Sequence, residues 1–261
     1  MYLRCPNCKL ELVLKDRQFI CANNHQFDRA KSGYVNLLQS QKNNSKNHGD
    51  DLAMLKSRKS FLDGGYYLPL VEKMKSIIES DKHNSILDAG CGEGWYCQHI
   101  GGNIIGIDIS KRGCDLSAKR NKDMTFAVAS SFDLPILDQS LDLVYSVFAP
   151  FSGSELSRVL KDNGRFIQVY PLVPHLMGLK ESIYDEAYPN DVLDSNIDGF
   201  SIESSHEVHD IIKLDNNKAI KDLFSMTPYV HRTKTHELLR LDNLDSVETE
   251  IAFGIRVYRK N

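Results

Sequence analysis

The sequence has no apolar run approaching the roughly 20 residues that a membrane-spanning helix requires. Its first residues also lack a basic segment followed by an apolar stretch, so no secretory signal is predicted. Apolar residues make up 41% of the 261 residues and charged residues 26%, which is typical of a folded globular protein and excludes wholesale disorder. We therefore expect a cytoplasmic protein with no membrane association.

The net charge is small as well, −3 over the whole chain, and does not by itself indicate a nucleic-acid binder. Its distribution is uneven, however. Residues 1–60 hold 11 Lys/Arg against 5 Asp/Glu, whereas the remaining 201 residues hold 21 against 30. This division either predicts a basic front end that meets phosphate groups or is an ordinary fluctuation of surface charge.

Cysteine is scarce, but three of the six cysteines lie in the first 21 residues. Cys5, Cys8, Cys21 and His25 follow the pattern C-x2-C-x12-C-x3-H. In a cytosolic protein such a cluster favours metal over disulfides. Three thiolates and one imidazole complete the tetrahedron that zinc prefers and leave no open position, so we predict a structural Zn²⁺ site.

The segment that carries these ligands is predicted to be a small hairpin. Residues 10–14 and 18–21 read as two short strands around a turn at 15–17. So short a segment has little core of its own, and the metal would supply much of its folding free energy. We assign residues 1–36 to this zinc-binding module. Its basic residues favour RNA contact, but the module could instead be a structural staple on the main domain; they are Arg4, Lys9, Lys15, Arg17, Arg29 and Lys31.

Residues 37–80 are predicted to be a linker followed by two helices. The polar run 39–48 is the best linker candidate in the chain. Residues 50–62 begin with two acids and then follow a helical pattern, and residues 68–78 form a second, amphipathic helix.

A glycine-rich loop follows directly on a short apolar strand at residues 85–88. It reads Asp88-x-Gly90-x-Gly92-x-Gly94, and glycines there let the backbone turn tightly and approach a ligand. The next strand, 103–109, carries Asp108, an acid placed to accept hydrogen bonds from ribose hydroxyls. This spacing differs from the dinucleotide fingerprint and resembles that of class I methyltransferases, whose cofactor is S-adenosylmethionine.

The rest of the chain continues the alternation of short strands and helices. Strands are predicted at 125–129, 141–150 and 165–170, with a helix at 154–160 and a turn at 161–164. We therefore predict an α/β fold, a class I methyltransferase (Rossmann-like) doubly wound sheet, joined to the small N-terminal zinc-binding β-hairpin module. The methyltransferase domain would span 81–261, with about 175–245 forming an inserted substrate-side subdomain and 247–259 a closing antiparallel strand or hairpin at the sheet edge.

With the zinc pattern and the glycine-rich loop combined, the chain resembles the bacterial 23S ribosomal RNA (guanine-N1)-methyltransferases over nearly its whole length. The segments that carry the resemblance are Cys5-Pro-x-Cys8, Cys21-x-x-x-His25-Gln26-Phe27-Asp28, Lys31-x-Gly33-Tyr34-Val35-Asn36-Leu37-Leu38, Gly49-Asp50, Arg58-x-x-Phe61-Leu62-Asp63-x-Gly65-x-Tyr67-x-Pro69-Leu70, Asp88-x-Gly90-Cys91-Gly92-Glu93-Gly94, Val128-Ala129-Ser130-Ser131, Ala149-Pro150, His175-Leu176-Met177-x-Leu179-Lys180 and Met226-Thr227-Pro228.

The resemblance implies an S-adenosylmethionine-dependent enzyme that methylates guanine N1 in a hairpin loop of 23S ribosomal RNA. It implies that the four Cys/His residues hold zinc and help to hold RNA, and that the protein is a homodimer. Family positions that contact the cofactor match Tyr67, Gly92, Glu93 and His175, and the class I core adds Asp88, Gly90 and Asp108.

Guanine N1 carries a proton near neutral pH, so methyl transfer needs a general base or a group that stabilises charge on O6. Residues 178–188 follow His175 and offer four candidate proton acceptors, Glu181, Tyr184, Asp185 and Glu186. We take Glu186 as the candidate base, against the alternative of a solvated helix face. Three other functions stay open: a small-molecule methyltransferase, methylation of another RNA or position, and a non-catalytic RNA-binding protein.

Overall fold

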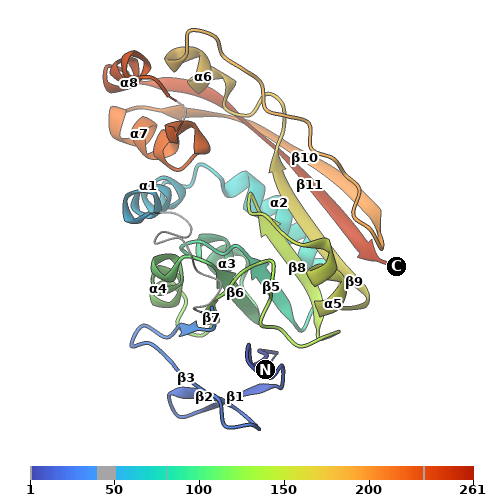
Figure 1. Cartoon of the computed structure of the whole chain (residues 1–261). Helices are drawn as coiled ribbons and strands as arrows, with labels where there is room; N and C mark the ends of the chain where they lie inside the picture. The colour runs from blue at the N-terminus through green and yellow to red at the C-terminus, as the bar shows by residue number, and fades with distance from the viewer. Residues whose placement is uncertain (1, 40–50, 81, 232) are drawn as a thin grey trace.

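A computed structural model describes residues 2–39, 51–80, 82–231 and 233–261. The chain forms a three-stranded sheet near the N-terminus and an eight-stranded sheet that makes up most of the molecule (Figure 1). The polar run predicted as a linker lies almost entirely outside the described residues, as do Gly49 and Asp50. Within the described part of the chain, no helix combines the length and the apolar character needed to cross a bilayer.

The small sheet contains the predicted hairpin. Strands β1 (Leu12–Lys15) and β2 (Gln18–Cys21) pair antiparallel, and Asp16 takes a positive φ of 54° in the turn between them. A third strand, β3 (Gln26–Asp28), pairs with β2 and was not predicted, because three residues are too short to show an alternating pattern.

The large sheet has the strand order β10-β11-β9-β8-β5-β6-β7-β4 (Figure 1). From β4 to β9 neighbouring strands are parallel, whereas β11 is antiparallel to both β9 and β10. The bounds are β4 Val35–Asn36, β5 Ile86–Ala89, β6 Ile104–Asp108, β7 Thr125–Val128, β8 Leu141–Val147, β9 Leu160–Pro171, β10 Phe200–Leu214 and β11 Val247–Lys260.

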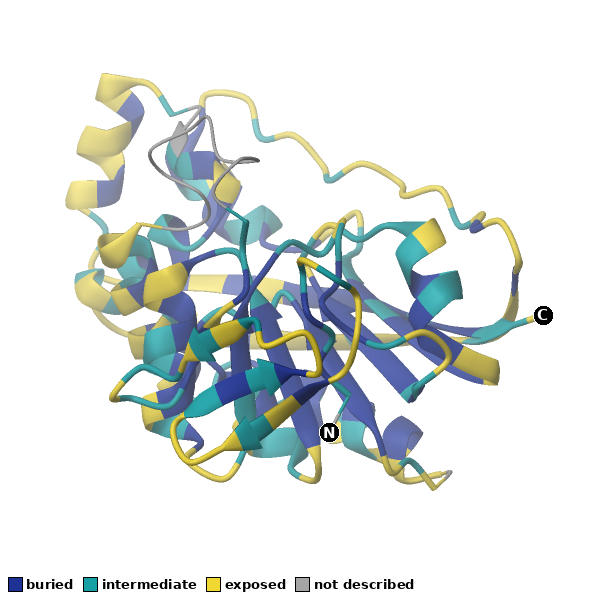
Figure 2. Ribbon diagram, turned by 60° about the horizontal axis from the view of Figure 1, so that its bottom comes forward, coloured by how far each residue is buried: buried dark blue, intermediate teal, exposed yellow. Residues whose placement is uncertain are grey.

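This order is the predicted doubly wound sheet. The chain passes from β5 through β6 to β7 on one side and then returns to place β8 and β9 on the other. The strand order therefore reverses at the β5–β8 pair, and a ligand is expected at the carboxyl ends of these strands. Every residue of β5 is buried, as a strand covered on both faces requires, and the central strands are dark blue in Figure 2.

Several helices cover one face of the sheet, and one helix and the N-terminal module cover part of the other. One hydrophobic cluster joins the sheet to buried residues of α1 (Leu52–Asp63), α2 (Leu68–Glu79), α3 (Trp95–Ile100) and α4 (Lys111–Arg120). A second cluster joins it to α5 (Gly153–Val159) and to the module. In that cluster the module contributes Leu3, Cys5, Leu12 and Phe19. The module is thus packed on the sheet.

The C-terminal part differs from the sequence-based expectation in three places. Strand β10 lies within the segment 175–245 yet belongs to the main sheet, so this segment is not a separate insertion as a whole. The other regular elements described in the segment are helical: α6 (Met177–Ile183), α7 (Asn217–Ser225), the 3-10 helix η2 (Pro228–His231) and α8 (Thr235–Asp242). The strand expected at 247–259 is present as β11, but β10 forms the edge. Residues 161–164, expected as a turn, fall inside β9, where the register with β8 shifts.

Candidate cofactor and metal sites

The four predicted metal ligands converge. Their ligand atoms all lie within 4.8 Å of one another, with the Cys8 and Cys21 sulfurs 3.5 Å apart. The His25 Nδ1 lies 3.4 Å from the Cys21 sulfur and 3.6 Å from that of Cys5. A tetrahedron with Zn–S bonds of about 2.3 Å and a Zn–N bond of about 2.0 Å has edges of roughly 3.4–3.8 Å. The donor set therefore fits a structural zinc ion.

Two tight backbone turns hold these ligands. Lys9 donates its backbone N–H to the Cys5 carbonyl at 2.9 Å, and Asn24 donates to the Cys21 carbonyl at 2.9 Å. Lys9 and Asn24 both take positive φ angles, 65° and 58°. Burial raises the pKa of the Cys21 thiol, but hydrogen bonds from the His25 backbone and the Cys8 side chain outweigh it, and the pKa falls to about 6. Cys21 is thus readily ionised near neutral pH, as a metal ligand must be.

The glycine-rich loop connects β5 to α3. Gly90, Gly92 and Gly94 have φ angles of 97°, 54° and 82°, which L side chains rarely adopt. A Cβ on Gly90 would lie only 2.3 Å from the Cβ of Ala149, and one on Gly94 would lie 2.9 Å from the Cα of Ser117. A Cβ on Gly92 would make only an ordinary contact, at 3.6 Å from an Arg58 guanidinium nitrogen. The loop thus packs tightly at its two ends and less tightly at Gly92.

Asp108, at the end of β6, is bonded to this loop. Its Oδ2 accepts a 2.8 Å hydrogen bond from the Gly92 N–H, and its Oδ1 accepts a 2.7 Å bond from the Ser110 N–H. These two bonds fix the carboxylate of Asp108 against the loop and the start of α4. The structure brings together the two segments that the spacing predicted, loop and second strand.

Asp88 lies beneath the loop and is only 1% exposed. Its Oδ2 accepts hydrogen bonds from the Tyr145 hydroxyl at 3.0 Å and the Cys97 thiol at 3.1 Å. Burial raises its pKa to about 7, against the opposing effect of these two bonds. This placement supports the loop from the core side; direct cofactor contact by Asp88 stays a prediction.

Glu93 is also buried, at 2% exposure, and forms a 2.6 Å ion pair with Arg120 of α4. Arg120 contacts Asp63 at 2.8 Å and Gln98 at 2.9 Å as well. Burial raises the pKa of Glu93, with Arg120 opposing that rise. Arg120 was not predicted as part of the site, because its acidic partners are 27 and 57 residues away and no local spacing relates them.

His175 and Tyr67 lie together in an aromatic cluster. The His175 ring is 6.2 Å from that of Tyr67 and 4.7 Å from that of Phe253. Its Nδ1 accepts a hydrogen bond from the Ala252 N–H at 3.1 Å, so the neutral ring carries its proton on Nε2. Burial, with a smaller effect of Lys180, lowers the pKa of His175 to about 3. His175 is therefore uncharged at neutral pH.

Phe148 connects this cluster to the glycine-rich loop. It follows β8 directly, takes a positive φ of 55°, and its ring is 44% exposed and 6.5 Å from that of His175. Its neighbour Ala149 is the residue that a Cβ on Gly90 would strike. Phe148 was not predicted as a site residue, although it lies at the end of a central strand, where ligands bind in such sheets.

The four candidate proton acceptors after His175 have different surroundings. Asp185 is paired with His236 and Arg240, which lower its pKa. The buried Tyr184 hydroxyl is 2.9 Å from the Thr233 hydroxyl, and burial raises its pKa. Glu181 and Glu186 are exposed. Of the four, the two glutamates are the ones for which the described residues provide no hydrogen bond or ion pair.

Known proteins match the chain in both of its parts. A zinc-ribbon family model described as "RlmA, N-terminal" matches residues 3–46, and a "Methyltransferase domain" model matches residues 87–168. The 23S rRNA (guanine(748)-N(1))-methyltransferase of Streptomyces fradiae is 31% identical, with 70% of this chain and 68% of that protein covered. The Bacillus subtilis protein YxjB, provisionally named a 23S rRNA (guanine-N(1)-)-methyltransferase, is 28% identical over 98% of this chain and 96% of its own length.

Proposed function

Given that the chain belongs to the 23S rRNA (guanine-N1)-methyltransferase family, we propose that it transfers a methyl group from S-adenosylmethionine to N1 of a guanine in a 23S rRNA hairpin loop. The observation that carries this proposal is the combination, in one chain, of a complete Cys3His ligand set with a glycine-rich loop bonded to Asp108. A small-molecule methyltransferase has little need of the first feature.

The residues that would hold the cofactor surround the carboxyl ends of β5, β6 and β8. Gly90 and Gly92 would approach it through their backbone, Asp108 would accept hydrogen bonds from its ribose, and Glu93, Asp88, Tyr67 and His175 would complete the site. When bound, S-adenosylmethionine supplies a methyl carbon activated by a positively charged sulfur. A neutral His175 suits such a site, because a protonated imidazole would repel that charge.

Catalysis in this proposal depends mainly on positioning. An in-line displacement gains most from holding the attacking atom close to the methyl carbon. N1 of a paired guanine is not accessible, so the target base must be unpaired or flipped out of its stack. The N1 proton would pass to a carboxylate, for which we propose Glu186.

The zinc module would contribute to RNA binding through its exposed cations. Arg4 and Arg29 are engaged within the protein, by Asp138 and by the Gly33 carbonyl. Lys15, Arg17 and Lys31 are exposed and remain for phosphate contact. We further propose a cytoplasmic homodimer, with residues 1–36 as the zinc module and 81–261 as the methyltransferase domain.

The first test is methyl transfer from labelled S-adenosylmethionine to unmodified 23S rRNA, with the modified base mapped by mass spectrometry. We expect 1-methylguanosine in a single hairpin loop. Zinc-loaded, cofactor-binding protein that incorporates no label would contradict the proposal. Arg17→Glu should weaken rRNA binding, whereas Lys213→Glu, an equally exposed change on β10, should not.

A further inference from the structure

A pocket of about 170 Å³ lies between the zinc module and the main sheet. Its volume is several times the roughly 30 Å³ that a water molecule occupies in the liquid, so it can admit a ring-sized group. One wall comes from the main domain, through Ile109 after β6 and Ala129 and Ser130 after β7. The facing wall comes from the N-terminal segment, through Arg4, Pro6, Lys9, Leu37, Leu38 and Gln39.

The first wall places this pocket at one end of the proposed cofactor site. Ile109 directly follows Asp108, the residue proposed to bind the ribose. The adenine is bonded to that ribose, so it must lie within a few ångströms of it. Ala129 and Ser130 follow the neighbouring strand β7, whose carboxyl end lies at the same edge of the sheet. The pocket is therefore where the adenine ring would reach.

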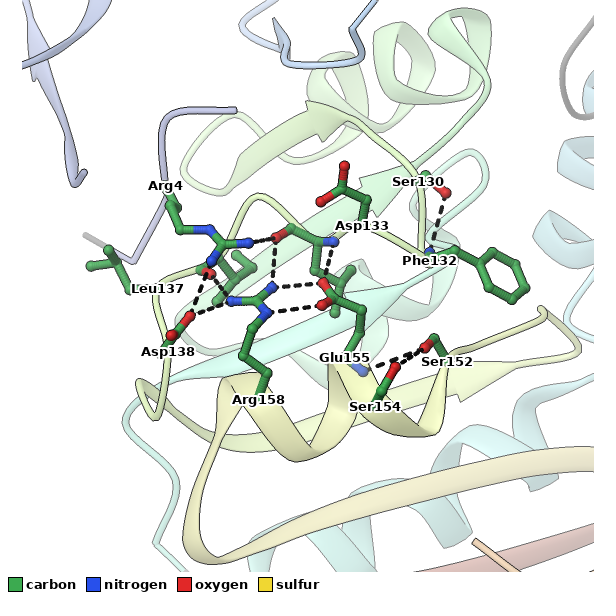
Figure 3. Close-up of polar contacts among 12 residues, drawn as sticks. Arg4, Ser130, Phe132, Asp133, Leu137, Asp138, Ser152, Ser154, Glu155 and Arg158 are labelled. Atoms are coloured by element: carbon green, nitrogen blue, oxygen red, sulfur yellow. Dashed lines mark hydrogen bonds and ion pairs between the residues drawn. The ribbon is translucent and has the colours of Figure 1, made fainter. Parts of the chain in front are cut away.

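The N-terminal segment is joined to this region by backbone pairing. Leu3 forms an antiparallel bridge with Ile136, the Arg4 N–H donates to the Pro135 carbonyl at 2.8 Å, and the Leu137 N–H donates to the Tyr2 carbonyl at 2.9 Å. The Arg4 guanidinium adds a 3.1 Å ion pair with Asp138 (Figure 3). Residues 2–4 thus extend along the loop that forms the floor of the pocket.

The other side of that loop is fixed by α5, independently of the module. Arg158 donates to the carbonyls of Leu134 at 2.9 Å and Ile136 at 2.7 Å, and Glu155 accepts the Leu134 N–H at 2.6 Å (Figure 3). Loss of the module's own structure would therefore leave the loop in place. It would remove the facing wall of the pocket.

The metal ligands determine the position of that facing wall. Cys5 directly follows Arg4 and is fully buried, and Pro6 and Lys9 lie within and just after the Cys5–Cys8 turn. The Gln39 side chain donates to the Pro6 carbonyl at 2.9 Å and so ties the chain after β4 to the same turn. A module this small depends on its metal for a fixed conformation. Bound zinc would thus order both segments of this wall, residues 4–9 and residues 37–39.

The charges around the pocket favour a neutral ring over a phosphate group. Arg4 is paired with Asp138, and Lys9 lies 3.8 Å from Asp133. Each cation is offset by a carboxylate, so little net positive charge faces the pocket. The remaining lining is mostly apolar, through residues such as Leu37, Leu38 and Phe132, and its polar members, Gln39 and Ser130, are uncharged.

From these observations we propose that the zinc module, together with residues 37–39 that directly follow it, is part of the cofactor site: it forms the outer wall of the adenine subsite, and zinc loading strengthens the binding of the adenine end of the cofactor. This inference rests on the proposed function, because it takes S-adenosylmethionine as the cofactor. It assigns the module a second role beside RNA contact.

The test measures binding of S-adenosylhomocysteine and of adenosine by calorimetry, using the full chain with zinc, after chelation, and with zinc restored. We expect chelation to lower both affinities by at least about tenfold and readdition to restore them. Circular dichroism of the chelated protein checks that the main domain stays folded.

A variant that still binds zinc tests the role of the pocket wall independently of the metal. Leu38→Trp should fill the pocket and lower both affinities by at least about tenfold, whereas Leu10→Trp adds the same side chain to an exposed position of the module and should change them less than about twofold. Either chelation or Leu38→Trp leaving S-adenosylhomocysteine affinity within about twofold overturns the inference. So does Leu38→Trp weakening rRNA binding alone, since the pocket then serves RNA. Native protein that binds no S-adenosylhomocysteine would instead refute the proposed function itself.

Discussion

The Tyr145 hydroxyl donates a 3.0 Å hydrogen bond to the Asp88 carboxyl group between strands β5 and β8, where the two residues are register partners. This pair lies at the point where the strand order reverses, directly beneath the glycine-rich loop. The Cys97 thiol donates to the same oxygen from α3. Both of these donors are neutral, and burial raises the pKa of Asp88 to about 7.

The first prediction concerns the pH dependence of stability at Asp88. Its pKa in the folded protein lies above the ordinary value of 3.8, so the folded state binds more protons between these values. The stabilisation is complete below the ordinary pKa and is lost as the pH rises through about 7. Asp88→Asn cannot ionise, so its stability relative to the native protein should rise by roughly 4 kcal/mol between pH 4 and pH 8. Urea denaturation of both proteins across this range measures the difference, and a constant difference would contradict the prediction.

The second prediction concerns the overlap between Gly90 and Ala149. Gly90→Ala would place two Cβ atoms 2.3 Å apart at a φ of 97°, and we expect it to destabilise the protein by about 3 kcal/mol and to weaken S-adenosylhomocysteine binding. Gly102→Ala is the matched control, because Gly102 has a similar φ of 91° and nothing within 4 Å. Gly102→Ala should lower the free energy of unfolding by only about 1–2 kcal/mol, because only the unfavourable backbone conformation contributes there.

A rescue variant makes the same prediction sharper. Replacing Ala149 by glycine removes the methyl group that a Cβ on residue 90 would strike. The double variant Gly90→Ala, Ala149→Gly should therefore be more stable than the sum of the two single changes predicts. If the changes in unfolding free energy of the two single variants simply add up in the double variant, the Ala149 methyl group is not what makes Gly90→Ala unfavourable.

The parts of this site that could be predicted from the sequence are those that depend on local spacing. The zinc ligands, the loop from Asp88 to Gly94 and the acid at Asp108 each follow from a short pattern whose geometry is set within about 20 residues. The central strands β5, β6, β7 and β8 could be predicted for the same reason, because each is a short apolar run.

The remaining parts depend on contacts between distant segments. The pairing of Leu3 with Ile136 and the ion pair of Glu93 with Arg120 join residues that no local pattern relates. Strand β10 was missed as a strand of the main sheet because its largely exposed side chains give no clear apolar alternation. The position of the zinc module on the sheet was left open for a similar reason: its basic residues suggested RNA, whereas its buried Leu3 and Cys5 pack against the core.

The third prediction concerns the metal content. The protein should bind one zinc ion per chain, and Cys8→Ser should reduce that content and lower the melting temperature, because the metal fixes a module that covers one face of the sheet. Cys114→Ser is the control, since Cys114 is buried in α4 outside the ligand set. Elemental analysis after gel filtration measures the zinc; full retention by Cys8→Ser would exclude this ligand assignment.

The fourth prediction concerns the protonation of His175. Its pKa of about 3 lies below the ordinary value of 6.5, so its contribution to stability is present above pH 6.5 and is lost as the pH falls toward 3. Nitrogen-15 NMR of the imidazole should show a neutral ring protonated on Nε2 at all pH values from 5 to 8, since Nδ1 accepts the Ala252 N–H. An apparent pKa near 6.5 for this ring would mean that the site is open to water.

The fifth prediction concerns the proton acceptor. Of the four candidates after His175, Asp185 is engaged by Arg240 and His236, and Tyr184 is bonded to Thr233, which leaves the exposed Glu186 and Glu181. Loss of a general base slows proton transfer by about 10²–10⁴-fold. Glu186→Gln should therefore lower the single-turnover rate of rRNA methylation by that order while S-adenosylhomocysteine affinity stays unchanged.

Glu181→Gln is the matched control for that change, because it removes the same charge from the surface of α6. It should leave the single-turnover rate within about twofold of the native value. If Glu186→Gln also leaves the rate unchanged, Glu186 is not the base. If Glu181→Gln is the slow variant instead, the proton leaves on the helix side of the site, and the base belongs to α6. A pH–rate profile then distinguishes loss of a base from loss of RNA affinity, since only the former removes the rise in rate with pH.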